Sequence, residues 1–135
     1  MLGPMDAEEA IAELTDISPQ VRQVVVVGAG GEVVGTNVES EARVSALADG
    51  ARRLAEGADE VRAARGLGPA AQLEAATVDG SVFVVREGER TIVATTIPEP
   101  TVGLVFYDLK TCVRQIEEPK PPTRRRTKKA DDAAA

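Results

Sequence analysis

The stretch Ser40–Gly66, SEARVSALADGARRLAEGADEVRAARG, carries the longest uninterrupted helical pattern in this chain of 135 residues. As an α-helix it would be roughly 40 Å long. Its larger apolar residues recur at steps of three and four positions, which places them in one row along a helix. They are Val44, Leu47, Ala51, Leu54, Ala58 and Val61. We therefore expect the rest of the fold to be arranged around one long amphipathic helix.

A second row of small residues, Ala46, Gly50, Gly57 and Ala64, lies beside the first. Together the two rows cover roughly half of the helix circumference, which is more than a helix needs to rest on one sheet. A glycine in a helix interior costs about 1 kcal/mol relative to alanine, so the two glycines indicate a close approach by another backbone. The alternative is an alanine-rich core helix with incidental glycines.

The simplest source of that backbone is the same helix of a second copy, and we predict a homodimer. The predicted dimer or partner interface consists of Val44, Leu47, Gly50, Ala51, Leu54, Gly57, Ala58 and Val61.

Composition places the chain among single domains with an aliphatic core. Hydrophobic residues make up 43% of the sequence, and the aromatic residues are limited to Phe83, Phe106 and Tyr107. A chain of this length forms one domain of ordinary size. The single cysteine, Cys112, cannot form an internal disulfide, and no amino-terminal apolar run has signal-peptide or membrane-spanning length. We therefore expect a cytoplasmic protein.

The residue inventory argues against an enzyme. The chain has no histidine, so Ser-His-Asp and Cys-His arrangements and metal sites built from histidine and cysteine are impossible. The helical carboxylates are expected to be solvated; they are Glu8, Glu9, Glu56, Asp59 and Glu60. Cys112 is expected to be a small buried hydrophobe. We predict no catalytic, cofactor-binding or metal-binding residues.

The stretch VRQVVVVGAGGEVVG at 21–35 is similar to the start of a dinucleotide-binding fold. The Rossmann fingerprint requires a third glycine at position 33, followed directly by a helix, and this chain has Val33 there with further strand residues after it. We therefore predict a β-hairpin in which Gly30 and Gly31 supply the positive φ angles of the turn.

The remaining elements follow from turn signals and periodicity. The predicted order is a helix at 7–17 capped by Asp6, strands at 23–27 and 32–36, the long helix at 40–66, strands at 71–78, 82–86 and 91–97, and a helix at 102–116. The Asp79-Gly80 pair is predicted to form a two-residue turn between two of the strands. This order predicts an α+β fold, in which one five-stranded antiparallel sheet packs against the long helix and two flanking helices.

Charge separates the chain into an acidic body and a basic end. The net charge is −6; from Lys120 onward there are six basic and two acidic residues, which leaves −10 for residues 1–119. We predict a loose N-terminus at 1–5, a folded domain at 6–118 and a disordered Pro-rich basic tail at 119–135, because the tail has no large apolar residue. The tail is a candidate for contact with a membrane or another polyanion, while specific nucleic-acid binding is not expected. Its candidate binding residues are Arg124, Arg125, Arg126, Lys128 and Lys129.

From about Asp6 to Ile116, the chain resembles the roadblock or dynein light chain superfamily. The residues that carry the resemblance are the valine strand and glycine turn at 24–35, the Thr36-Asn37 exit, the long helix from Ser40, and the segment 98–109 with Leu104 and Asp108-Leu109. The resemblance implies a profilin-like α/β sandwich that dimerises through the long helix and a sheet edge. It also implies, for bacterial members, a small Ras-like GTPase as partner.

Two functional classes therefore remain open. The first is a dimeric regulatory module for a small GTPase, to which Arg52, Arg53, Arg62 or Arg65 could supply a charge-stabilising arginine, although surface ion pairing is their commoner use. The second is a scaffold or adaptor subunit without a nucleotide-dependent partner. Sensing of a small ligand is a third, weaker alternative, because an aliphatic core offers few polar groups to hold a ligand.

Overall fold

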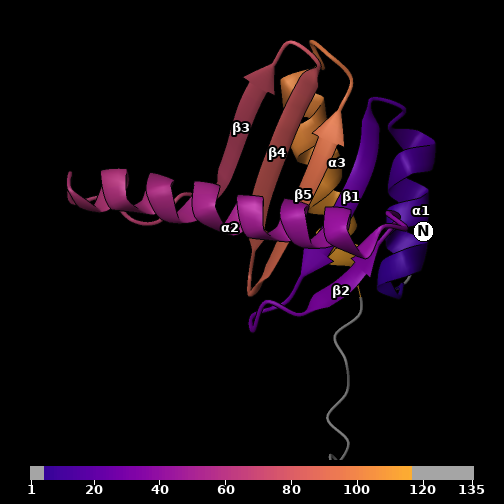
Figure 1. Cartoon of the computed structure of the whole chain (residues 1–135), viewed down its shortest axis with the longest axis horizontal. Coiled ribbons are helices and arrows are strands. Elements are labelled where there is room, and N and C mark those ends of the chain that lie inside the picture. Colours follow the sequence, from indigo (N-terminus) through magenta and orange to yellow (C-terminus); the bar gives the residue numbers. More distant parts are fainter. Residues whose placement is uncertain (1–4, 117–135) are drawn as a thin grey trace, which may run out of the picture.

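The computed structural model describes residues 5–116, and Figure 1 shows the arrangement of its helices and strands. The elements are α1 (Ala7–Ile17), β1 (Val21–Val27), β2 (Val33–Thr36), α2 (Glu41–Ala63), β3 (Gln72–Thr77), β4 (Gly80–Glu87), β5 (Arg90–Thr96) and α3 (Val102–Gln115). The predicted order of helices and strands is confirmed.

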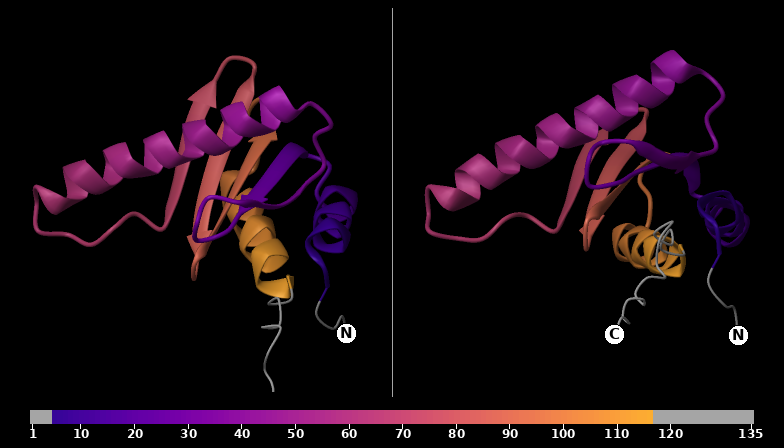
Figure 2. Two further views of the ribbon diagram at one scale, coloured as in Figure 1. Left: turned by 60° about the horizontal axis from the view of Figure 1, so that its bottom comes forward. Right: turned by 90° about the horizontal axis from the view of Figure 1, so that it is seen from below.

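All strand pairs are antiparallel, and the strands form one sheet in the order β2-β1-β5-β4-β3. Figure 2 shows that α2 crosses one face of this sheet, whereas α1 and α3 lie together on the other face. The predicted α+β class with a five-stranded antiparallel sheet is confirmed.

The central strands bury side chains on both faces, which explains the continuous valine run of β1. Val24 and Val26 belong to the core under α1 and α3, while Val25 belongs to the core under α2. Under α3, Phe83 and Phe106 pack edge to face with ring centroids 4.9 Å apart. The larger core therefore lies between the sheet and the α1–α3 layer.

The glycine turn at 28–31 joins β1 to β2 as a hairpin, as predicted, and no helix follows it. The backbone N–H of Gly28 donates to the carbonyl of Glu32 at 2.9 Å. The prediction that both Gly30 and Gly31 adopt positive φ is only half right, because Gly31 alone does so, at 86°. One residue in the left-handed region is sufficient here, since the Glu32 side chain accepts the Gly30 N–H at 3.1 Å and supports the turn.

The turn between β3 and β4 lies one residue earlier than predicted. Thr77 pairs with Gly80, so the two turn residues are Val78 and Asp79, and Gly80 is already in the strand. Its φ of 148° and the 2.1 Å between an added Cβ and the carbonyl oxygen of Thr96 explain why glycine stands there. The glycine of the Asp79-Gly80 pair is therefore required by the close approach of β4 to β5, and not by the turn itself.

The helix ends follow the expected capping chemistry. Asp6 and Glu9 form a capping box at the start of α1, and Ser40 accepts the N–H of Arg43 at the start of α2. After α2, Leu67 N–H donates to the carbonyl of Arg62 and Gly66 adopts a φ of 77°, which is a Schellman ending.

The described residues begin at Met5, which contacts the end of α3. Met5 forms a β-bridge with Ile116 and donates its N–H to the Gln115 carbonyl at 2.8 Å. The candidate tail residues at 119–135 lie outside the described residues. Among residues 5–116, no helix is long and apolar enough to cross a membrane.

Candidate protein-binding surface

One face of α2 packs against the sheet of the same protomer. Val44, Ala51 and Ala55 are buried there, and Leu47 and Ala48 pack partly against the same core. The steps from Val44 to Ala55 are those of a single helical face. Two residues of the predicted interface, Val44 and Ala51, are therefore occupied within the protomer.

Five other predicted interface residues, which are Gly50, Leu54, Gly57, Ala58 and Val61, face away from the sheet, whereas Leu47 packs partly against it. Val61 is 65% exposed, Leu54 is also exposed, and Ala58 is half-buried. An added Cβ at Gly50 or Gly57 would meet nothing within 4 Å. This outward row of small and apolar side chains has no partner among residues 5–116.

The same half of α2 extends past the edge of the sheet. Figure 1 shows the helix crossing β1, β5, β4 and β3 and continuing beyond β3. β3 is an edge strand whose residues are exposed or only half-buried. A free strand edge and an unpartnered helix face therefore lie next to each other on one side of the molecule.

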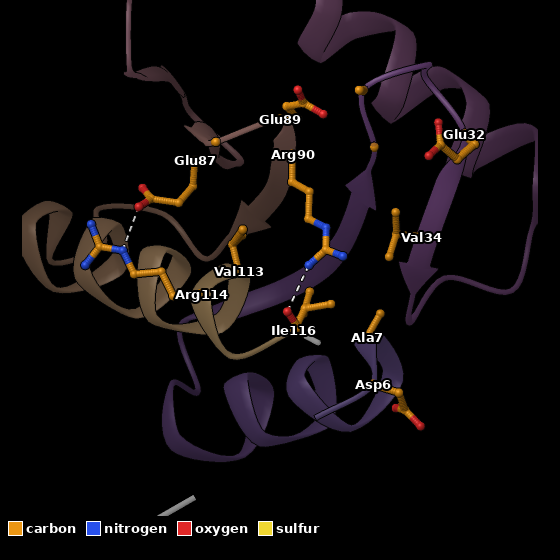
Figure 3. Close-up of a pocket in the computed structure, with 13 residues that line it drawn as sticks. Asp6, Ala7, Glu32, Val34, Glu87, Glu89, Arg90, Val113, Arg114 and Ile116 are labelled. Carbon is orange, nitrogen blue, oxygen red and sulfur yellow. Dashed lines mark hydrogen bonds and ion pairs between the residues drawn. The ribbon is translucent and has the colours of Figure 1, made fainter. Parts of the chain in front are cut away.

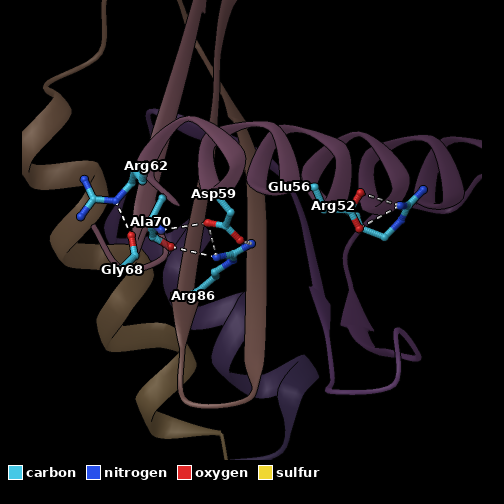
Figure 4. A network of polar contacts seen from close by, with 7 residues as sticks. All are labelled: Arg52, Glu56, Asp59, Arg62, Gly68, Ala70 and Arg86. Carbon is cyan, nitrogen blue, oxygen red and sulfur yellow. Dashed lines mark hydrogen bonds and ion pairs between the residues drawn. The ribbon is translucent and has the colours of Figure 1, made fainter. Parts of the chain in front are cut away.

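A polar network holds the outer half of α2 to the sheet (Figure 4). Arg86 of β4 donates two hydrogen bonds to Asp59, at 3.1 and 2.9 Å, and a third to the Ala70 carbonyl at 3.0 Å. The Ala70 N–H in turn donates to Asp59 at 2.9 Å. The Arg86 hydrogen bonds, followed by that of Ala70, lower the pKa of the Asp59 carboxyl below its ordinary value. This network fixes the direction in which the outward row is presented.

The prediction that Asp59 is a solvated helical carboxylate is wrong, because its carboxylate is half-buried and paired with Arg86. Glu56 and Glu60 on the same helix are exposed, as predicted. The Asp59–Arg86 pair spans 27 positions along the chain, and no local pattern distinguishes Arg86 from other strand arginines.

The arginines considered for a GTPase partner are largely engaged within the protomer. Arg52 pairs with Asp49 and Glu56 on its own helix, and Arg53 also approaches Asp49. The Arg52 hydrogen bond is the main reason that the pKa of Asp49 is lowered. Arg62 donates to the Gly68 carbonyl at 2.6 Å. The expectation of surface ion pairing is confirmed for Arg52 and Arg53.

Cys112 is buried in the core under α3, and burial raises the pKa of its thiol to about 12. It is therefore protonated at neutral pH and unsuited to nucleophilic chemistry. The prediction that it packs as a small hydrophobe is confirmed.

A cavity of about 1070 Å³ lies at the end of the molecule where α3 finishes, among the β1–β2 turn, the β4–β5 turn and the start of α1 (Figure 3). Six of its 13 lining residues are charged. Arg114 donates to Glu87 at 2.7 Å and Arg90 to the Ile116 carbonyl at 3.0 Å. Ligand pockets for small molecules are mostly apolar with a few polar groups, so this cavity does not favour the ligand-sensor alternative.

Comparison with known proteins places this geometry in a fold group. No protein-family model and no curated protein sequence matches the chain. Among solved structures, Myxococcus xanthus MglB matches with a TM-score of 0.69 at 13% identity, covering 82% of this chain and 84% of that one. A roadblock/LC7 domain from Streptomyces avermitilis matches with a TM-score of 0.69 at 16% identity, covering 83% and 93%.

This chain has the roadblock fold. The wider profilin-like relationship is also present: a chain of the LokiProfilin2–rabbit actin complex matches with a TM-score of 0.55 at 14% identity, covering 78% of this chain and 91% of that one. The roadblock element order and sheet account for nearly the whole described body, and the likeness is one of fold.

Proposed function

We propose that this roadblock-fold chain is a non-catalytic regulatory or adaptor module that forms a homodimer through α2 and binds a small Ras-like GTPase. The observation that carries the proposal is the outward row of α2, which consists of Gly50, Leu54, Gly57, Ala58 and Val61. An unpartnered apolar row beside a free strand edge is the kind of surface that proteins bury in an interface.

The two glycines favour a helix as the covering element. Gly50 and Gly57 lie seven residues apart on the outward side, with open space above each. Glycines in this spacing let two helix backbones approach closely, which offsets their cost in a helix interior. A second copy of α2 supplies such a backbone with matching geometry, since a two-fold contact uses the same surface on both partners.

The GTPase part of the proposal comes from the roadblock resemblance, and the non-catalytic part is supported by the absence of histidine from the chain. Within residues 5–116, no group of three or more metal-ligating side chains could hold a metal ion. The module would therefore act by binding, and Arg52, Arg53 and Arg62 of α2 are held in contacts within the protomer.

The test is capture of a purified Ras-like GTPase from the source genome by the immobilised chain, with GDP or a non-hydrolysable GTP analogue present. Sedimentation of the chain alone at micromolar concentration should show a dimer. A dimer whose GTPase capture differs between the two nucleotides supports the proposal. A dimer that shows no nucleotide-dependent capture supports the alternative, a scaffold or adaptor subunit of a larger complex, and a monomer contradicts both.

A further inference from the structure

On the face opposite α2, apolar side chains are exposed where α1 ends and α3 begins. Leu104 is 50% exposed and Tyr107 is 66% exposed, and their spacing of three residues makes them neighbours on the α3 surface. Ile17, the last residue of α1, is also exposed. We call Ile17, Leu104 and Tyr107 the α1–α3 patch.

The antiparallel packing of α1 and α3 brings these residues to one end of the molecule. At the other end, Met5 and Ile116 form a β-bridge, while here the Gln20 side chain accepts the Thr101 N–H at 2.7 Å. Figure 1 shows the end of α1 and the start of α3 at the same end of the sheet. The patch is thus a surface feature of the helical layer, separate from the outward row of α2.

A second observation, independent of the apolar residues, indicates that a ligand of the patch should carry a positive charge. Asp108 follows Leu104 by one helical turn, so both lie on the same side of α3. Asp108 is only 8% exposed, and its carboxylate has no hydrogen-bond or ion-pair partner among residues 5–116. Asp108 is not among the side chains with fully shielded, unpaired oxygens, so a cation delivered by a ligand could reach its carboxylate and pair with it.

The charges around the patch are mainly acidic, with Lys110 as the basic residue three positions after Tyr107 on α3. Within Ala7–Ile17, the charged residues are all acidic, and Glu13 and Asp16 precede Ile17 directly on the last turn. Across the connection to α3, Glu99 is exposed. The rim of the patch therefore presents carboxylates around an apolar centre.

We propose that the α1–α3 patch is a second docking surface, which binds a protein segment with apolar anchor residues flanked by lysine or arginine, one of which pairs with Asp108. This surface does not depend on the proposed homodimer or on a GTPase. Exposed tyrosine and leucine side chains beside an unpaired charged group can serve as the anchor residues of a protein interface.

Other occupants fit the patch less well. A second copy placed on it by a two-fold axis would set one mainly acidic rim against another, which is repulsive. The chain after Ile116 is basic but has no large apolar residue to cover Leu104 and Tyr107. An anionic membrane is opposed by the acidic rim.

Binding to the patch can be measured by the intrinsic fluorescence of Tyr107, because Tyr107 is the single tyrosine and there is no tryptophan. A synthetic amphipathic helix of about 14 residues, with leucines along one face and lysines on the other, serves as the probe. Titration into the full chain should change Tyr107 emission saturably with a micromolar midpoint. The same peptide with glutamate in place of lysine should bind at least about tenfold more weakly.

Two variants locate the binding. Leu104→Ser should weaken binding of the lysine peptide about tenfold or more, while Leu67→Ser, a matched change at a leucine that is 49% exposed after α2, should leave it unchanged. Asp108→Asn preserves shape and should also weaken binding, yet its thermal transition should stay the same, because the Asp108 carboxylate makes no hydrogen bond or ion pair among residues 5–116 that the change would remove.

Four results would overturn the proposal. They are a Tyr107 signal unchanged up to millimolar lysine peptide, equal binding of the glutamate peptide, equal binding by Leu104→Ser and Leu67→Ser, and equal binding by Asp108→Asn. A change of Tyr107 emission on adding anionic vesicles, or a concentration-dependent dimer that Leu104→Ser breaks, would assign the patch to a membrane or to a second copy instead.

Discussion

Arg86 on β4 holds Asp59 on α2 by two hydrogen bonds of 2.9 and 3.1 Å, and this pair ties the outer half of the long helix to the sheet. The helix continues past β3, where no other strand supports it (Figure 1). The direction of the outward row, and with it the proposed dimer geometry, therefore depends on a contact that spans 27 residues of sequence.

Replacing the Asp59 carboxylate should loosen the outer half of α2. Asp59→Asn keeps the shape of the side chain but removes the charge that Arg86 binds. We expect a lower melting temperature and faster amide hydrogen exchange at 56–63, measured by mass spectrometry. Glu60→Gln changes an exposed neighbour and should alter neither. Equal exchange in both variants would contradict this role.

The contribution of Asp59 should depend on pH with a defined sign. Its pKa in the folded protein is lowered below the ordinary value of 3.8, mainly by the Arg86 hydrogen bonds. A lowered pKa stabilises the fold above the unfolded-state pKa and ceases to do so as the pH falls through the folded-state pKa. The stability difference between the parent and Asp59→Asn, measured by urea unfolding, should be constant above about pH 5 and shrink below about pH 4. A difference that grows on acidification would argue against this pairing.

Gly57→Glu should separate dimerisation from folding. An added Cβ at Gly57 meets nothing within 4 Å in the protomer, so the fold should tolerate the substitution, but the glutamate places a charge where two α2 backbones would meet. Sedimentation should show a dimer for the parent and a folded monomer for the variant. Gly103→Glu makes the same change at an open position on α3 and should remain dimeric. A dimeric Gly57→Glu protein would refute the proposed interface.

Gly80→Ala should be among the most damaging small substitutions. The new Cβ would lie 2.1 Å from the Thr96 carbonyl oxygen, and the φ of 148° disfavours a side chain. We expect a loss of about 3 kcal/mol or more of unfolding free energy, measured in urea. Gly68→Ala, where an added Cβ meets nothing within 4 Å, should change stability by less than about 0.5 kcal/mol. Similar losses of unfolding free energy in the two variants would mean that the close approach of β5 to Gly80 does not exclude a side chain there.

Deletion of residues 119–135 should leave the melting temperature and the sedimentation of the chain unchanged. This expectation follows from sequence, because no large apolar residue after Ile116 could anchor that segment to the body. A fall of several degrees on deletion would show that the segment packs on the domain.

Local sequence determined the order of elements because capping, turn and periodicity signals act over a few residues. Asp6 and Ser40 mark helix starts, Gly66 marks the end of α2, and the valines of β1 mark a strand buried on both faces. These preferences hold before any long-range contact forms. They also sufficed to exclude a dinucleotide loop at 28–33.

Only the tertiary structure decided which helical residues are free for a partner. The row from Val44 to Val61 looks uniform in sequence, but the sheet is narrower than α2 is long, so Val44 is buried and Val61 is left exposed. The pairing of Asp59 with Arg86 and the burial of Asp108 without a partner likewise depend on segments brought together by folding. Helical periodicity shows only which residues share a face of a helix. Whether that face is buried depends on how the helices pack on the sheet.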